Sequence, residues 1–296
     1  MNTDLRWLAN ESMSCLHAAE VVRRMADAAE PRMAAAIAEA TAALVIEVTA
    51  LGLPEERFWE HVIPLSAQMG GNRHLADVTL RKCGRNSDDT AASHLATRIG
   101  ELESAVRQEF PTLAEDMTSQ GLGLRDQWDR IGTDLLRTIA HLIEDELLPG
   151  SAEIVLVYPV QRGGGSAHVL YNSVRMEATE DDPVPKLPEA VRLAWLISQL
   201  NLELPMFSET VNAHRLPTVA ALATLPAALQ AAEAADLAAC DQSHVKLALK
   251  TWMPQFQCNE GFTEQLLKWW EVYSGNRPRF GVAIGALDQI LQNESA

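Results

Sequence analysis

The sequence lacks the cysteine and histidine spacings that hold metals or carry redox chemistry. Its four cysteines, at positions 15, 83, 240 and 258, stand far apart. No CxxC pair occurs, which excludes a zinc ribbon and a thioredoxin-type motif. HExxH is absent, and no histidine follows a glutamate at the ExxH spacing of di-iron bundles. We therefore expect no metal site and no cofactor.

Motifs for nucleophiles and nucleotides are missing as well. The chain has no GxSxG, no GxGxxG and no GxxxxGK[ST]. The only acidic pairs that could suggest magnesium-dependent diphosphate chemistry, Asp88-Asp89 and Asp181-Asp182, fall in expected loops, and neither has a third aspartate at helical spacing. The sequence therefore leaves open whether the protein is an enzyme.

Positive charge is scarce: 24 Lys and Arg stand against 40 Asp and Glu, a net charge of −16. Nucleic acids and anionic membranes both demand basic side chains. The longest uncharged run, Leu216 to Ala232, contains two prolines and is shorter than the ~20 residues of a membrane span. The first residues lack the basic start and apolar stretch of a signal peptide. We expect a cytoplasmic protein that binds neither nucleic acid nor membrane.

What the sequence does contain is alanine and helical periodicity, which predict a mainly α, multi-helix fold with one small β element. In the segment from Leu124 to Leu148, apolar residues form one stripe, so Leu135 and Ile139 should lie in the core. A helix is predicted over each of the following ranges: 4–30, 32–51, 54–69, 90–110, 124–148, 188–204, 217–239, 242–252, 263–273 and about 281–291.

The β element is predicted at residues 153–160, where an unbroken apolar run indicates a strand covered on both faces. Such a strand needs a neighbour, and three are considered. One is Asp77–Arg81, whose alternation suggests a short strand inside a loop at 70–89. The others are a hairpin mate within 167–176 and another subunit. The apolar spacing in 167–178 itself favours a helix.

Pro149-Gly150-Ser151 is the expected internal boundary. It separates an N-terminal helical half, 1–148, from a C-terminal half, 149–296, that carries the β element. The two halves could also form one continuous domain.

The sharpest candidate site is the Gly-rich stretch after the strand, and we expect it to lead into a helix. Glycine lets a backbone approach a ligand closely, and the N–H groups at a helix start favour an anion. A flexible connector or hairpin turn is the competing interpretation. The candidate ligand-binding residues here are Arg162, Gly163, Gly164, Gly165, Ser166 and His168.

A second candidate is the basic cluster of Arg73, Arg81 and Arg85 in the acidic chain. Arginine could hold a carboxylate or phosphate there, or it could pair with acidic residues of the same surface.

Two functions follow from these observations. The first is a helical interaction or scaffold protein, binding another protein or a second copy of itself. Adjacent Trp269 and Trp270 point about 100° apart on a helix. The usual burial of tryptophan favours packing of both in the core, but one of them could be exposed. The strand at 153–160 also needs a partner. The second is an enzyme or binding protein for a small anion held at 162–168.

Overall fold

Four short strands form one sheet in a computed structural model that describes residues 3–25, 29–86, 88–202, 207, 209–257, 259 and 261–294. The strands are β1 (Asp4–Ala9), β2 (Ser151–Val157), β3 (Gly165–His168) and β4 (Ser173–Glu177). Their order is β1-β2-β4-β3. β1 and β4 run parallel to β2, whereas β3 runs antiparallel to β4.

Helices make up most of the described chain, as predicted. They are α1 (Glu11–Met25), α2 (Pro31–Ala50), α3 (Glu55–Ser66), α4 (Asn72–Lys82), α5 (Asp89–Glu109), α6 (Leu113–Gln120), α7 (Leu122–Leu142), α8 (Glu189–Ile197), α10 (Leu216–Ala234), α11 (Gln242–Trp252), α12 (Phe262–Asn276) and α13 (Phe280–Glu294), with short 3-10 turns η2 (Asp145–Leu147) and η3 (Val169–Tyr171).

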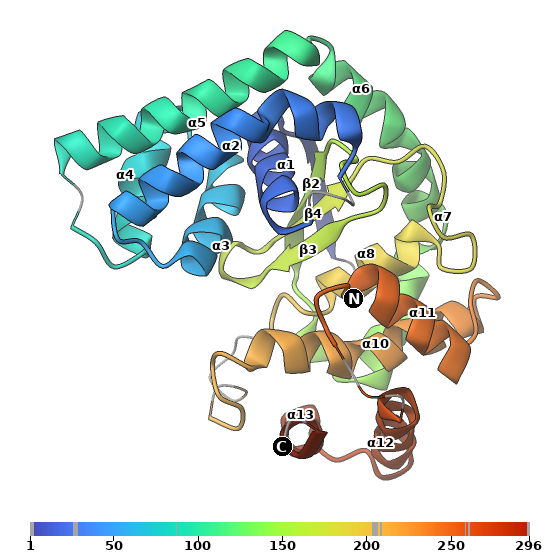
Figure 1. Ribbon diagram of the computed structural model, residues 1–296. Helices are drawn as coiled ribbons and strands as arrows, with labels where there is room; N and C mark the ends of the chain where they lie inside the picture. Colours follow the sequence, from blue (N-terminus) through green and yellow to red (C-terminus); the bar gives the residue numbers. More distant parts are fainter. Residues whose placement is uncertain are drawn as a thin grey trace.

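The helices lie in two groups about the sheet (Figure 1). α1 to α5 pack together on one side, and α1 contacts β2 directly. α8 contacts β3 and β4 on the other side and is backed by α7 and α10. α11, α12 and α13 extend this second group. The sheet is therefore covered on both faces, which explains the unbroken apolar run in β2.

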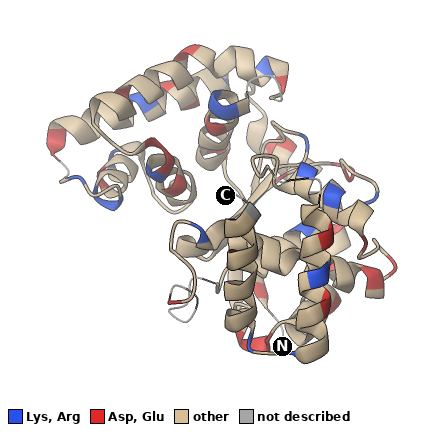
Figure 2. Ribbon diagram, turned by 60° about the horizontal axis from the view of Figure 1, so that its bottom comes forward, with Lys and Arg blue, Asp and Glu red and all other residues tan. Residues whose placement is uncertain are grey.

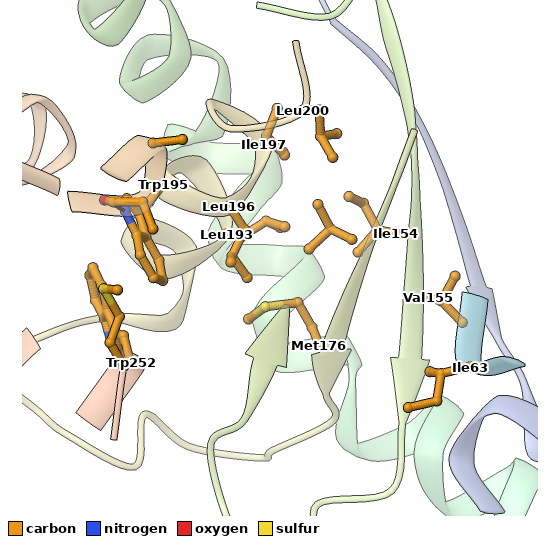
Figure 3. Packing of buried hydrophobic residues seen from close by; sticks show 14 of the residues in the cluster. Ile63, Ile154, Val155, Met176, Leu193, Trp195, Leu196, Ile197, Leu200 and Trp252 are labelled. Atoms are coloured by element: carbon orange, nitrogen blue, oxygen red, sulfur yellow. Dashed lines mark hydrogen bonds between the residues drawn. The ribbon is translucent and has the colours of Figure 1, made fainter. Parts of the chain in front are cut away.

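Side chains alternate between these two groups along each strand. In Figure 3, Ile154 and Met176 point toward Leu193 and Leu196 of α8, while Val155 points the opposite way, toward Ile63 of α3. All of these side chains are buried. The apolar face of the sheet therefore packs on α8, and the remaining positions of β4 face α1.

Several segments differ from the predictions. α6 was not predicted, and the helix expected over 124–148 ends at Leu142. Residues 4–9 form a strand instead of a helix, because pairing with β2 supplies their hydrogen bonds. Asp77–Arg81 is not a strand, and the loop expected at 70–89 holds α4, whose Leu75, Ala76 and Leu80 are buried at helical spacing. Residues 167–178 are not a helix: they comprise the end of β3, η3 and β4.

The strand at 153–160 finds its neighbours within the chain. β1 pairs with β2 from Asp4↔Ser151 to Ala9↔Leu156, and β4 pairs with it from Glu153↔Ser173 to Val157↔Glu177. Segment 167–176 was one of the expected partners, but β4 lies parallel to β2 and forms its hairpin with β3. The sheet also joins strands from both sides of the boundary expected at 148/149.

The core follows the predicted helix stripes. Leu135 and Ile139 of α7 are buried, as expected. α10 is buried along most of its length, and Pro226 lies inside it without ending it. Trp269 and Trp270 are both buried, and their indole N–H groups donate to Ala283 O and Gln230 Oε1. The expectation that both tryptophans pack in the core is therefore confirmed, and the alternative that one of them is exposed is wrong.

Candidate functional site

The Gly-rich segment is a tight turn from β2 into β3. Arg162 and Gly163 both have positive φ, 57° and 128°. Glycine adopts the φ of Gly163 readily, whereas the left-handed backbone of Arg162 is strained. A Cβ on Gly163 would lie 2.8 Å from the Pro183 ring, so this position also needs glycine for space. The turn continues into strand β3 and not into the helix that the sequence favoured.

This turn already encloses an anion, the carboxylate of Glu177. The backbone N–H groups of Gly163 and Gly164 donate to Glu177 Oε2 at 2.7 and 2.9 Å. The N–H of Gln161 donates to Oε1 at 2.8 Å. Successive N–H groups of this kind form a concave anion-binding turn. The backbone N–H groups of Gly163 and Gly164, which the sequence suggested as donors to a ligand, therefore already donate to a carboxylate of the same chain.

Glu177 also contacts α1 on its other side. Its Oε1 accepts a hydrogen bond from His17 Nε2 at 2.7 Å, and both residues are buried. Burial alone would raise the pKa of Glu177, but the hydrogen bonds from His17, Gln161 and Gly163 outweigh it and lower that pKa. Burial and the Arg175 charge lower the pKa of His17. We therefore describe the pair as an ionised carboxylate and a neutral imidazole.

Arg175 and His168 lie beside this pair. Arg175 Nη1 donates to Glu20 Oε2 at 3.2 Å, and Glu20 also pairs with Arg24. Arg175 and Arg24 bring the pKa of the buried Glu20 below its usual value, although burial acts to raise it. The pKa of His168 is lowered by burial and then by Arg175. Sequence reasoning proposed His168 but missed His17, Arg175 and Glu177.

A second buried pair lies on the other side of the turn. Glu189 and Arg192 of α8 approach within 3.3 Å, and Arg192 lies over the Trp252 ring at 5.7 Å. Burial raises the pKa of Glu189 to about 7, while the Arg192 charge acts to lower it. Neither carboxylate oxygen of Glu189 has a hydrogen-bond partner among the described residues. This carboxyl group therefore titrates near neutral pH.

The basic residues from the other candidate cluster are engaged by their own surroundings. Arg73 pairs with Asp89, Arg81 with Asp77, and Arg85 donates to the carbonyl of Leu51. An open hollow of about 520 Å³ at the start of α4 is lined by Gly70, Gly71, Arg73, His74 and Asp77. None of these lining residues belongs to 162–168, so this hollow does not join the two predicted sites. Acidic and basic residues are interspersed along the helices (Figure 2).

The outer face of α2 exposes mostly small apolar side chains. α2 packs on α1, α3 and α5 through Met33, Ile37, Leu44 and Val48, yet only 28% of its most apolar 18-residue window is buried. By length and composition alone, it is the one described helix that could cross a membrane. Its exposed positions include Ala35, Ala38, Glu39, Ala42 and Ile46, and Ile46 is 68% exposed.

Comparison with known protein families, with curated proteins and with solved structures finds no match for this chain. Among the described residues, no three His, Cys, Asp or Glu side chains gather as cation ligands. The fold and the site define a mainly helical protein, organised around a small mixed sheet whose strand β4 is apolar on one face and carries Arg175 and Glu177 on the other.

Proposed function

We propose that this chain is a helical interaction protein and that the outer face of α2 binds a second copy of the chain. The observation that carries the proposal is an apolar helix of which only 28% of the most apolar window is buried, with Ala35, Ala38, Ala42 and Ile46 exposed. Exposed apolar surface of this kind is characteristic of a binding site. Ile46 is the most exposed large apolar side chain in the described residues, and it lies on this face.

The pattern of the face is suited to pairing with itself. A two-fold contact must be self-complementary, so that residue i meets j and j meets i. If two α2 helices cross antiparallel with Ala42 at the axis, Ile46 of each copy meets Ala38 of the other. A large side chain then fills the space above a small one, and the two Glu39 side chains stay apart.

The expected affinity is modest. A 20-residue helix is about 30 Å long and about 10 Å wide, so its exposed face offers roughly 300 Å². Stable interfaces bury about 800 Å² per partner. We therefore expect a dimer that dissociates at micromolar concentration. Each copy carries a net charge of −16, so added salt should strengthen the association by screening repulsion.

Sedimentation equilibrium across a concentration series tests the proposal. The parent chain should shift from monomer to dimer, and Ile46→Glu should abolish the shift without unfolding the chain. Val282→Glu is the matched control, because Val282 is 65% exposed on α13, away from α2. A parent that stays monomeric, or equal loss of dimer in both variants, would contradict the proposal.

Disulfide trapping tests the geometry of the contact. Ala42→Cys should cross-link between copies, whereas Ala50→Cys, two helical turns from the axis, should not. A vesicle-binding assay with anionic lipid supplies the competing outcome. Membrane association that Ile46→Glu removes, with no dimer in solution, would assign this face to a lipid surface instead.

A further inference from the structure

The face of β4 that packs on α1 is polar throughout. Ser173, Arg175 and Glu177 occupy alternate positions along this strand, and all three are buried. Burying a charged group is unfavourable unless the group is paired and hydrogen-bonded. Glu177 meets that condition fully, since its four hydrogen bonds come from His17 and three backbone N–H groups.

Three nitrogen atoms of His17 in α1, His168 in β3 and Arg175 in β4 do not meet that condition. His17 Nδ1, His168 Nε2 and Arg175 Nε are buried and have no hydrogen-bond partner among the described residues. His17 is 1% exposed and Arg175 is 7% exposed. A buried donor or acceptor without a partner destabilises the fold, because it has lost its hydrogen bonds to water and gained none in their place. Three such atoms in one region therefore indicate a group that binds between them.

Strand register brings these side chains together. Ser166 lies opposite Arg175 and His168 opposite Ser173, so His168 and Arg175 are diagonal neighbours on the same face. Diagonal neighbours are about 7–8 Å apart at Cα, within reach of long side chains. Arg175 and Glu177 are two residues apart on β4, about 7 Å, and His17 is bonded to Glu177.

The hydrogen bond to Glu177 fixes what the site can accept. Because the neutral His17 donates its Nε2 proton to Glu177, its Nδ1 carries a lone pair and needs a donor. Arg175 Nε–H, in contrast, needs an acceptor. An oxyanion can accept a hydrogen bond from Arg175 Nε–H. If a proton is taken up with the anion and binds to His17 Nδ1, this nitrogen becomes a second donor to the anion. Glu20, Arg24 and Glu177 are the other charged groups about His17 and Arg175.

We propose that His17, His168 and Arg175 form a binding site for a small oxyanion, which is bound together with one proton. The ligand enters from the side of β3, where Ser166, Ala167 and His168 are only half-buried. The site is distinct from the turn at 161–164, whose N–H groups bind Glu177.

Titration calorimetry of the full chain with sodium acetate and sodium sulfate tests the proposal. Neither anion carries its own proton between about pH 6 and pH 8, so any proton taken up enters the complex from solvent. Measurement in two buffers with different ionisation enthalpies counts that proton. We expect about one proton per bound anion and an affinity that falls about tenfold for each pH unit.

Two variants and two controls locate the site. His17→Gln keeps a side-chain N–H for Glu177 but removes Nδ1, and His168→Asn removes Nε2. Each should weaken binding by about tenfold or more. His94→Asn, on the exposed side of α5, and Arg162→Ala, in the turn, should leave the affinity unchanged.

Binding that Arg162→Ala abolishes and both histidine variants retain would overturn the proposal and place the anion at the turn. Absence of any binding by the parent chain, or binding without proton uptake, would overturn it too. These measurements on the parent stand even where a variant fails to fold.

Discussion

His17 and Glu177, which are 160 residues apart in the sequence, share a 2.7 Å hydrogen bond between α1 and β4. The carboxylate on one side of this bond organises the turn at 161–164, and the imidazole on the other side belongs to the N-terminal helical group. One buried carboxylate therefore connects the turn, the sheet and α1.

Glu177→Gln should destabilise the protein by about 2–4 kcal/mol, because hydrogen bonds to a charged group contribute about 1.5–3 kcal/mol and the amide cannot accept from all four donors. Urea unfolding measures the change. Glu153→Gln is the control: Glu153 pairs with the exposed Arg6, and its loss should cost less than about 1 kcal/mol. Equal effects of the two substitutions would show that the turn does not depend on Glu177.

Glu189 should make stability fall as pH rises. Its pKa is about 7 in the folded chain and its ordinary value is 4.5, so between these values the folded state holds a proton that the unfolded state has lost. This contribution is fully present below about pH 4.5 and is lost by about pH 7; it amounts to at most about 3 kcal/mol.

Unfolding free energies of the parent and Glu189→Gln at several pH values isolate this contribution. Buried His17 acts in the opposite sense, since its lowered pKa destabilises the fold as pH falls below about 6.5. The difference between parent and variant removes that shared term. An identical pH slope in both proteins would refute a raised pKa at Glu189.

Two helical glycines should respond oppositely to alanine. A Cβ at Gly132 in α7 would lie 2.3 Å from the ring of the buried Trp128, so Gly132→Ala should destabilise by about 1–3 kcal/mol. At Gly100 in α5 the nearest atom is 3.7 Å away, so Gly100→Ala should stabilise by about 0.5–1 kcal/mol through helix propensity. Thermal unfolding compares them, and stabilisation by both would mean that Trp128 moves aside freely.

Leu135→Ala and Ile139→Ala should each cost about 2–5 kcal/mol, because both side chains are buried in α7. Val282→Ala on α13 is the exposed counterpart and should cost less than about 0.5 kcal/mol. Chemical denaturation at constant pH measures all three. A cost below about 0.5 kcal/mol at both α7 positions would contradict the packing of this helix.

The helices were predictable where a single face is apolar over many turns. The predicted and observed bounds of α11 agree, and those of α2 and α5 agree within about one residue, because periodicity and caps coincide there. The short strands were harder. β1 is only six residues long, and its pairing depends on residues near 151 that local sequence does not specify.

The sequence analysis also missed the polar face of β4 that packs on α1, for a related reason. Ser173, Val174, Arg175, Met176 and Glu177 alternate strictly, which is a strand signal, but the apolar spacing through Tyr171 and Ala178 favoured a helix. In a strand of alternating pattern, the polar side chains are normally expected to face solvent. Both faces of β4 are buried, and the burial of its polar face follows from tertiary contacts with His17 and Glu20 of α1, which the local sequence does not show.

The parallel pairing of β1 with β2 sets an order of events during synthesis. β1 leaves the ribosome before β2, and this hydrogen-bonding neighbour is translated more than 140 residues later. Until then the strand has no partner edge, and Leu5, Trp7 and Leu8 stay open to other contacts. Closure of so long a loop slows folding. In the nascent chain β1 therefore stays unpaired while the seven described helices from α1 to α7 are translated after it.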